Sequence, residues 1–287
     1  MNSYEWMVKY TSQTEWIKGG GMLVWLSFYA GILGSGSYLV SLYFNNLLGM
    51  LVSWLIIVVI KNGFHMAHAK RPMRMWRMIL RPKSSWLSRG TIFIGLFTGC
   101  GFIQLILSYL LPGTPAEITF KLLTGIAVCA VLLYEGFTLN YIKGIPFWNS
   151  ALLPVLFIFW GLLSGLALIA TIGWSGADSS GLAAGNQLFL IATIILTVLY
   201  MWSASYAGAA AQESVKIILQ GNLSLIFGVG AVLLGMIIPL IIWWLSSVVG
   251  QTLAVTILVC EIIGGLAFTY SVFKAGVYSP IISNDWR

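Results

Sequence analysis

Residues 68–90 read HAKRPMRMWRMILRPKSSWLSRG and separate two long apolar stretches of the chain. This segment carries seven of the fifteen Lys and Arg residues, and His68 at its start is one of only two histidines. The apolar runs on either side are each about as long as a helix that crosses a bilayer. Residues 68–90 therefore form a polar connection between two membrane spans, where polar chemistry or a docking partner would meet the protein.

The composition of the whole chain indicates a polytopic integral membrane protein. Of its 287 residues, 59% are hydrophobic and 8% are charged, whereas a soluble domain carries about 25% charged residues. Residues 1–20 lack the short apolar core and small-residue cleavage site of a signal peptide, so we expect the first span to direct insertion. We expect the basic residues to meet membrane lipid or a protein partner, and no nucleic acid.

Eight apolar windows are long enough to cross a hydrocarbon core of about 30 Å as helices. The fold class is therefore all-α, with eight transmembrane helices in one transmembrane domain, residues 1–287. Residues 1–143 and 144–287 are candidates for two four-helix bundles, although no internal repeat supports that division. The predicted spans are about 22–43, 47–67, 91–111, 119–141, 150–172, 186–206, 223–246 and 251–273.

The distribution of basic residues predicts the orientation. With eight spans both termini share one side with residues 68–90, and that side holds fourteen Lys and Arg residues against Lys121 alone on the other. The positive-inside rule then places the termini and residues 68–90 in the cytoplasm, with the protein in a prokaryotic cytoplasmic membrane. The fourteen are Lys9, Lys18, Lys61, Lys70, Arg71, Arg74, Arg77, Arg81, Lys83, Arg89, Lys143, Lys216, Lys274 and Arg287.

The sequence encodes no metal, haem or iron–sulfur centre that we can recognise. Cys100, Cys129 and Cys260 are far apart and lie in apolar runs, whereas zinc and iron–sulfur sites need clustered thiolates. We expect these cysteines to be small buried residues. His65 and His68 are three residues apart on one helix, so they share a face and cannot hold haem between two helices.

Charged residues inside the spans are candidates for function because they are expensive in a bilayer. Lys61 can reach the membrane surface by snorkelling. Glu135 follows Tyr134 near the basic end of its span, where a carboxyl beside a phenol can bind a polar head group and pass protons, or bond between helices. Glu261, in the middle of the last span, belongs either to a proton path or to a bridge between helices. Pro239 predicts a kink in the seventh span.

Residues 68–77, HAKRPMRMWR, followed by residues 81–90, RPKSSWLSRG, closely resemble the polysulfide reductase/NrfD family of membrane subunits. The resemblance extends along most of the chain in order. WLSFYAGILGSGSYLVSLYF (25–44) is similar to the family's Gly-rich first span, and YEGFTLNYIKGIPFWNSALLPVLFIFWGLLSG (134–165) to its fourth-to-fifth junction. AAAQESVKIILQGNLSLIFGVGAVLLGMIIP (209–239) and CEIIGGLAFTYSVFKAG (260–276) resemble its later spans, although Thr269 stands where the family often has Arg after Gly-Gly.

This resemblance implies an eight-helix, quinone-binding membrane anchor without a metal of its own. Such subunits exchange electrons between quinone, either menaquinone or ubiquinone, and a ferredoxin-like iron–sulfur subunit that serves a molybdopterin catalytic subunit in respiration. Quinone turnover would then occur here and the terminal chemistry on a partner. Known relatives hold those partners on the outer face. Either the partner is cytoplasmic here, as we favour, or an acidic partner covers an outward-facing basic loop.

The resemblance also assigns candidate site residues. Tyr134 matches a quinone-contacting Tyr, His68 and Arg71 match the loop signature, and Ser27, with Tyr29 nearby, stands where some relatives place a quinone-contacting His. Glu135 and His68 are the candidates for proton transfer. The predicted partner interface consists of Arg74, Trp76, Arg77, Arg81, Trp86 and Arg89.

Two other functions stay open from the sequence. A secondary transporter or ion-translocating subunit would need a polar cluster at the membrane midplane and broken helices, for which Glu261 and Pro239 are the hints. A purely structural anchor is the third possibility.

Overall fold

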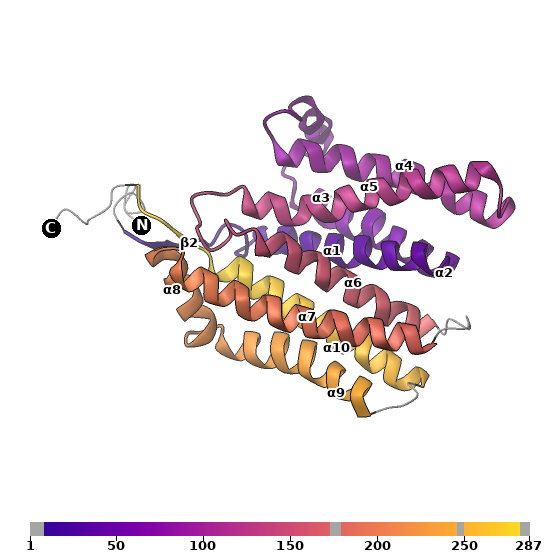
Figure 1. Cartoon of the computed structure of the whole chain (residues 1–287). Coiled ribbons are helices and arrows are strands. Elements are labelled where there is room, and N and C mark those ends of the chain that lie inside the picture. The colour runs from indigo at the N-terminus through magenta and orange to yellow at the C-terminus, as the bar shows by residue number, and fades with distance from the viewer. Residues whose placement is uncertain (1–8, 173–178, 246–249, 282–287) are drawn as a thin grey trace.

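The computed structural model describes residues 9–172, 179–245 and 250–281. Figure 1 shows long helices running side by side, with two short strands at one end. The helices are α1 (Gly21–Tyr43), α2 (Leu47–Leu55), η2 (Ile56–Lys61), α3 (Asn62–His68), η3 (Pro72–Leu80), α4 (Trp86–Leu110), α5 (Pro115–Asn140), α6 (Leu152–Ile172), α7 (Ser179–Tyr206), α8 (Ala209–Leu219), η4 (Ile226–Ile237), α9 (Ile238–Leu245) and α10 (Gln251–Ala275); the strands are β1 (Thr11–Ser12) and β2 (Val277–Tyr278).

Eight helical segments within the described residues are long and apolar enough to cross a membrane. This confirms the predicted all-α, eight-span architecture. The second span, Leu47–His68, is built from α2, η2 and α3 without interruption, and η4 continues directly into α9 to make the seventh. The predicted limits agree within a few residues at most ends.

The third span begins earlier than predicted. It starts at Trp86, not at residue 91, because the Ser85 side chain caps the helix by accepting a hydrogen bond from the Ser88 backbone N–H at 3.3 Å. Hydropathy alone missed this turn because it contains Ser88 and Arg89. Trp86 and Arg89 therefore lie on a membrane helix and not in the loop.

Two spans contain π-helix, which no sequence pattern predicted. η2 spans Ile56–Lys61, and η4 spans Ile226–Ile237 before Pro239 near the start of α9. Proline has no N–H with which to continue the hydrogen-bond ladder of a helix. Next to Pro239, where a kink was predicted, the π-helix η4 gives way to the α-helix α9.

The prediction of buried cysteines was wrong, since Cys129 is exposed and Cys100 and Cys260 are half-buried.

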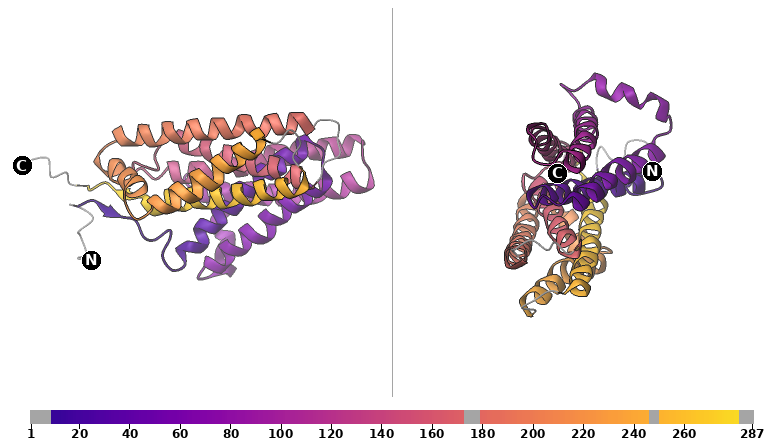
Figure 2. Two further views of the ribbon diagram at one scale, coloured as in Figure 1. Left: turned by 90° about the horizontal axis from the view of Figure 1, so that it is seen from below. Right: turned by 90° about the vertical axis from the view of Figure 1, so that its right-hand side faces the viewer.

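The first four spans and the last four form two neighbouring groups, joined mainly through α1, α5, α6 and α10 (Figures 1 and 2). Small residues allow the closest contact. A Cβ atom at Gly36 of α1 would overlap the backbone of Gly161 on α6, so both glycines are needed for the helices to approach this closely. This packing puts α1 at the centre of the molecule.

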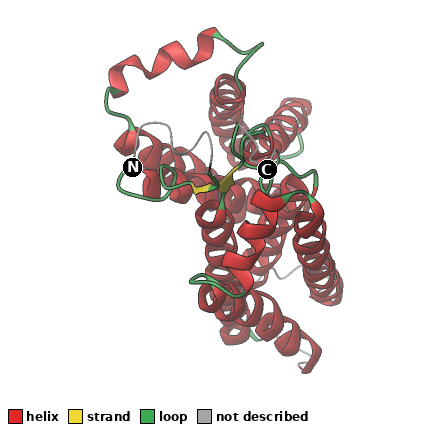
Figure 3. Cartoon of the chain, turned by 90° about the vertical axis from the view of Figure 1, so that its left-hand side faces the viewer, coloured by secondary structure: helices red, strands yellow, loops and turns green. Residues whose placement is uncertain are grey.

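One end of the bundle gathers both described chain ends and the basic segment 68–90. β1 pairs with β2 in antiparallel register, and the His68 ring lies 2.8 Å from the Gly20 carbonyl oxygen. Figure 3 looks onto this end, where the strands lie near the middle and η3 projects at the rim. We call this end the polar end. It positions the site described next.

Candidate functional site

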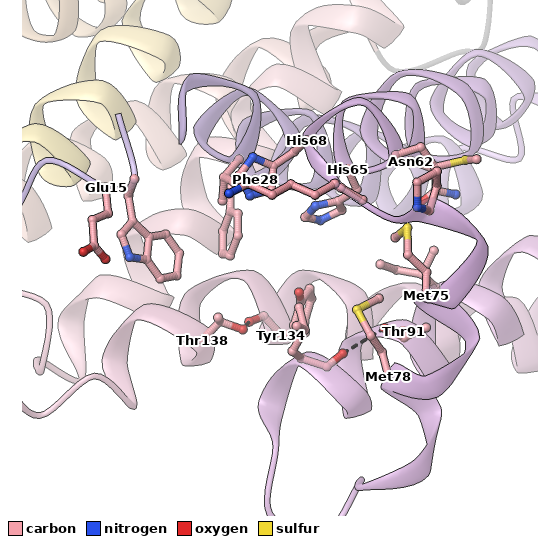
Figure 4. A pocket seen from close by; sticks show the side chains of 18 residues that line it. Glu15, Phe28, Asn62, His65, His68, Met75, Met78, Thr91, Tyr134 and Thr138 are labelled. Atoms are coloured by element: carbon pink, nitrogen blue, oxygen red, sulfur yellow. Dashed lines mark hydrogen bonds between the residues drawn. The ribbon is translucent and has the colours of Figure 1, made fainter. Parts of the chain in front are cut away.

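A cavity of about 890 Å³ opens near the polar end, between α1, α3, α4 and α5. η3 covers it with Met75 and Met78, and the N-terminal segment closes one side with Glu15 and Trp16 (Figure 4). Most of its wall is apolar. A concave, largely apolar space of this size with a few polar groups is typical of a small-molecule site.

The cavity opens sideways between α3 and α4. Met66 on α3 is 57% exposed and Leu87 on α4 is 44% exposed, and both line the cavity. Farther from the polar end the two spans are tied together, because the Trp54 indole N–H donates to the Thr98 carbonyl oxygen at 3.2 Å. The opening therefore faces the surface that a bilayer would cover, and it is bounded by η3 on one side and Trp54 on the other.

His65, His68, Tyr134 and Thr138 are among the polar side chains that line the cavity. His68 is exposed, whereas Tyr134 is buried. Figure 4 shows the two histidines on the wall opposite Tyr134 and Thr138. Because the Gly20 carbonyl can only accept a hydrogen bond, His68 donates from Nδ1 at 2.8 Å. In the neutral ring the other nitrogen, Nε2, is then an acceptor. His68 in this state can take up a proton.

Tyr134 is held rigidly by its neighbours. Its side chain is 1% exposed, and its ring packs against Phe28 with centroids 6.2 Å apart. A Cβ atom at Gly90 would overlap the same ring, so α4 and α5 can enclose it only because position 90 is glycine. Held in this way, the phenol is a fixed donor and acceptor at the cavity wall.

A buried ion pair lies directly behind the cavity wall. Lys61 Nζ is 2.6 Å from Glu135 Oε1, and both side chains are completely buried. The same Nζ lies 5.6 Å from the centroids of the Phe28 and Tyr134 rings. The prediction that Lys61 snorkels was wrong, because η2 turns it inward on the face that also buries Ile57.

Glycine again makes room for this pair. A Cβ atom at Gly31 of α1 would overlap Glu135 Oε1 and lie 3.0 Å from Lys61 Nζ. Ser27, one turn earlier on α1, donates to the Lys61 carbonyl oxygen at 3.0 Å. The first span therefore supports the ion pair with its small residues.

The sequence of residues 19–280 matches the family described as Polysulphide reductase, NrfD. The chain belongs to the NrfD family. It is also 29% identical over 188 residues to Protein NrfD of Escherichia coli (strain K12), an alignment that covers 61% of this chain and 57% of that protein. This chain is thus an integral membrane protein of the NrfD family.

Of the residues that the NrfD resemblance assigned to quinone, some line the cavity and others do not. Tyr134 and His68 line the cavity. Ser27 lies behind its wall, and Arg71 is exposed beside it without being among the lining residues. Tyr29 points to the other half of the bundle, where its hydroxyl donates to the Ile262 carbonyl oxygen at 2.9 Å.

The residues of the predicted partner interface, on the NrfD-type basic loop, also differ in their exposure. Arg74, Trp76, Arg77 and Arg81 are exposed on or beside η3. Trp86 instead stacks on Phe137 with centroids 5.3 Å apart. Arg89 covers Trp86 at 4.6 Å and donates to the carbonyls of Pro82 and Lys83 at 2.7 and 2.9 Å. These two half-buried residues hold the loop onto the helices.

Sequence reasoning missed several groups at this NrfD-family site, namely His65, Thr138 and the role of Lys61 as counter-ion to Glu135. The signal for His65 was its spacing of three from His68, which places both on one helical face. The signal for Lys61 was the presence of a charge inside a span. No group of three or more metal-ligating His, Cys, Asp or Glu residues occurs within the described part of the chain.

Proposed function

We propose that this chain is the quinone-reactive membrane subunit of a respiratory oxidoreductase complex. It would exchange electrons between menaquinone or ubiquinone and an iron–sulfur partner subunit, which serves a molybdopterin catalytic subunit. The observation that carries the proposal is the lateral cavity of about 890 Å³, whose mostly apolar wall also carries His65, His68 and Tyr134.

The dimensions and chemistry of the cavity fit a quinone. A head group needs hydrogen-bond partners for two ring oxygens, and Tyr134 and the histidines supply them. An isoprenoid tail needs an apolar exit into the bilayer, and the opening between Met66 and Leu87 supplies one. A bound quinone would supply two-electron chemistry coupled to two protons.

The wall residues can carry the proton half of that reaction. Neutral His68 accepts a proton at Nε2 when a quinol is oxidised, and the charged ring returns it in the reverse direction. The Tyr134 hydroxyl can donate to the second ring oxygen. Glu135 does not line the cavity, so its proposed part in proton transfer runs through Tyr134, behind which the Lys61–Glu135 pair lies.

Electrons would leave towards the polar end, where the exposed residues of η3 offer a surface to a partner. The cavity lies against this end, which keeps the distance between quinone and a partner's cluster short. By the charge bias we propose that this end faces the cytoplasm in a prokaryotic cytoplasmic membrane. Arg74, Trp76, Arg77 and Arg81 are the proposed contacts with the partner or with lipid phosphates.

The test is quinone-linked turnover and quinone affinity of the purified complex. Tyr134→Phe and His68→Ala should each slow quinone-linked electron transfer by about 10²-fold or more, the usual contribution of one positioned acid–base group, while assembly is retained. The matched control is Tyr141→Phe, because Tyr141 lies at the same end but is 60% exposed and outside the cavity. Normal quinone kinetics in both cavity variants would disprove the site assignment.

A further inference from the structure

A second buried acid lies in the other half of the bundle. Glu261 is the eleventh residue of the 25-residue helix α10, about 15 Å from its start. Its side chain is completely buried, and neither carboxyl oxygen has a hydrogen-bond partner among the described residues. Glu261 forms no ion pair within these residues, whereas Glu135 is paired with Lys61 and Glu117 with Lys121.

The surroundings of Glu261 are polar and come from three other helices. Asn186 on α7 faces the carboxyl, is completely buried, and leaves both of its amide atoms without a partner in the described structure. Tyr29 on α1 donates to the carbonyl oxygen of Ile262, the next residue. Ser164 on α6 lies beside the Tyr29 hydroxyl. Four helices therefore direct polar groups to one point at the middle of the membrane.

Glu261 differs from Glu135 in one respect. Glu135 has Lys61 at 2.6 Å and can keep its charge, whereas an unpaired carboxylate at this depth is very unfavourable. A protonated carboxyl has one O–H donor and one carbonyl acceptor, and the Asn186 amide has the complementary N–H donors and carbonyl acceptor. The two side chains can therefore satisfy each other when Glu261 holds a proton.

We propose that Glu261 and Asn186 form an exchangeable proton-binding site, with Tyr29 and Ser164 completing its polar wall. This site is distinct from the quinone cavity: α1 separates them, with Gly31 against Glu135 on one face and Tyr29 against Glu261 on the other. Tyr29 and the adjacent Cys260 are titratable groups close to Glu261 in the described structure. A proton held at mid-membrane is what an ion-translocating subunit requires.

Infrared spectroscopy of the full chain in lipid nanodiscs tests the proposal. At neutral pH the wild type should show a C=O band of a protonated carboxyl that shifts on transfer to D₂O and disappears at high pH. Glu261→Gln, which keeps the shape and hydrogen-bonding capacity of the side chain, should remove the band. Asn186→Leu should shift it. Glu117→Gln is the matched control, because Glu117 is paired with Lys121, and it should leave the band unchanged.

Three results would overturn the proposal. The first is the absence of a Glu261-dependent band at neutral pH, which means that the carboxyl is ionised. The second is a band that responds to neither D₂O nor pH while the protein stays folded, which means a purely structural acid. The third is loss of the band on adding Na⁺ at constant pH, which means a sodium site. Tyr134→Phe should leave the band intact, so failure of the quinone proposal is separately detectable.

Discussion

The buried pair Lys61–Glu135 allows a quantitative test of how the spans are held together. Its nitrogen and oxygen atoms are 2.6 Å apart and both side chains are inaccessible to solvent. At an effective dielectric constant of about 20, two unit charges at that distance attract by about 6 kcal/mol. Most of that energy offsets the cost of taking both charges out of water, so the net contribution of the intact pair is small.

Replacing one partner of the pair should lower the free energy of unfolding far more than replacing both partners together. In Lys61→Met the Glu135 carboxylate stays buried without its counter-ion, and the free energy of unfolding should fall by about 3–5 kcal/mol. Glu135→Leu leaves Lys61 equally isolated and should cost a similar amount. The double variant buries two apolar side chains of similar volume, so it should lose several kcal/mol less than the sum of the single losses.

The assay is equilibrium unfolding in mixed micelles, followed by tryptophan fluorescence, for the two single variants and the double variant. Lys121→Met is the matched control. Lys121 makes an ion pair of nearly the same length, 2.7 Å to Glu117, but its side chain is 22% exposed. Glu117 also accepts hydrogen bonds from the Ser108 hydroxyl at 2.7 Å and the Gly113 N–H at 2.6 Å. These two hydrogen bonds to the Glu117 carboxylate remain when Lys121 is replaced. Lys121→Met should therefore lower the free energy of unfolding by about 1 kcal/mol or less.

Two outcomes would refute this reasoning. If Lys61→Met costs no more than Lys121→Met, burial does not control the strength of the pair. If the double variant loses as much free energy of unfolding as the two single variants added together, Lys61 and Glu135 do not interact. Either result would also remove the electrostatic support that the proposed quinone site draws from the pair behind Tyr134.

Two further changes test the packing of the first span and its neighbour. Gly36→Val should destabilise the fold by at least about 1–3 kcal/mol because its side chain would overlap Gly161, whereas Gly99→Val, at an open surface position, should change the thermal midpoint little. A wild-type midpoint for Gly36→Val would contradict the close contact. Asn46→Ala should cost about 1 kcal/mol in micelle unfolding, because the Asn46 side chain caps α2 by accepting from Gly49 N–H at 2.7 Å. No loss of stability would mean that the cap contributes nothing.

Much of the fold was predictable from local information. Twenty-residue apolar runs can satisfy their backbone polar groups in a bilayer only as helices, so hydropathy alone predicts the eight spans. The early start of α4 was missed because the Ser85 cap and the Arg89 side chain compete with the hydropathy signal. The π-helical segments η2 and η4 were also missed, since no local pattern in the sequence predicts them.

The candidate site was predictable only in part. Tyr134 and His68 were predicted from the family resemblance, and both line the cavity. Ser27 and Tyr29 both lie on α1, yet the Ser27 hydroxyl bonds the Lys61 carbonyl oxygen and the Tyr29 hydroxyl bonds the Ile262 carbonyl oxygen on α10. A helix presents side chains in all directions, and a sequence does not state which neighbour each one meets.

The sequence by itself determined the membrane class, the number of spans and the end that carries the basic loop, because each follows from transfer of side chains between water and hydrocarbon. The tertiary structure decided which buried charges are paired. Lys61 and Glu135 are 74 positions apart in the chain but meet beside Gly31, while Glu261 lies beside Asn186 and has no ion-pair partner among the described residues. Charge pairing depends on distances of a few ångströms between helices, and only the packed bundle sets those distances.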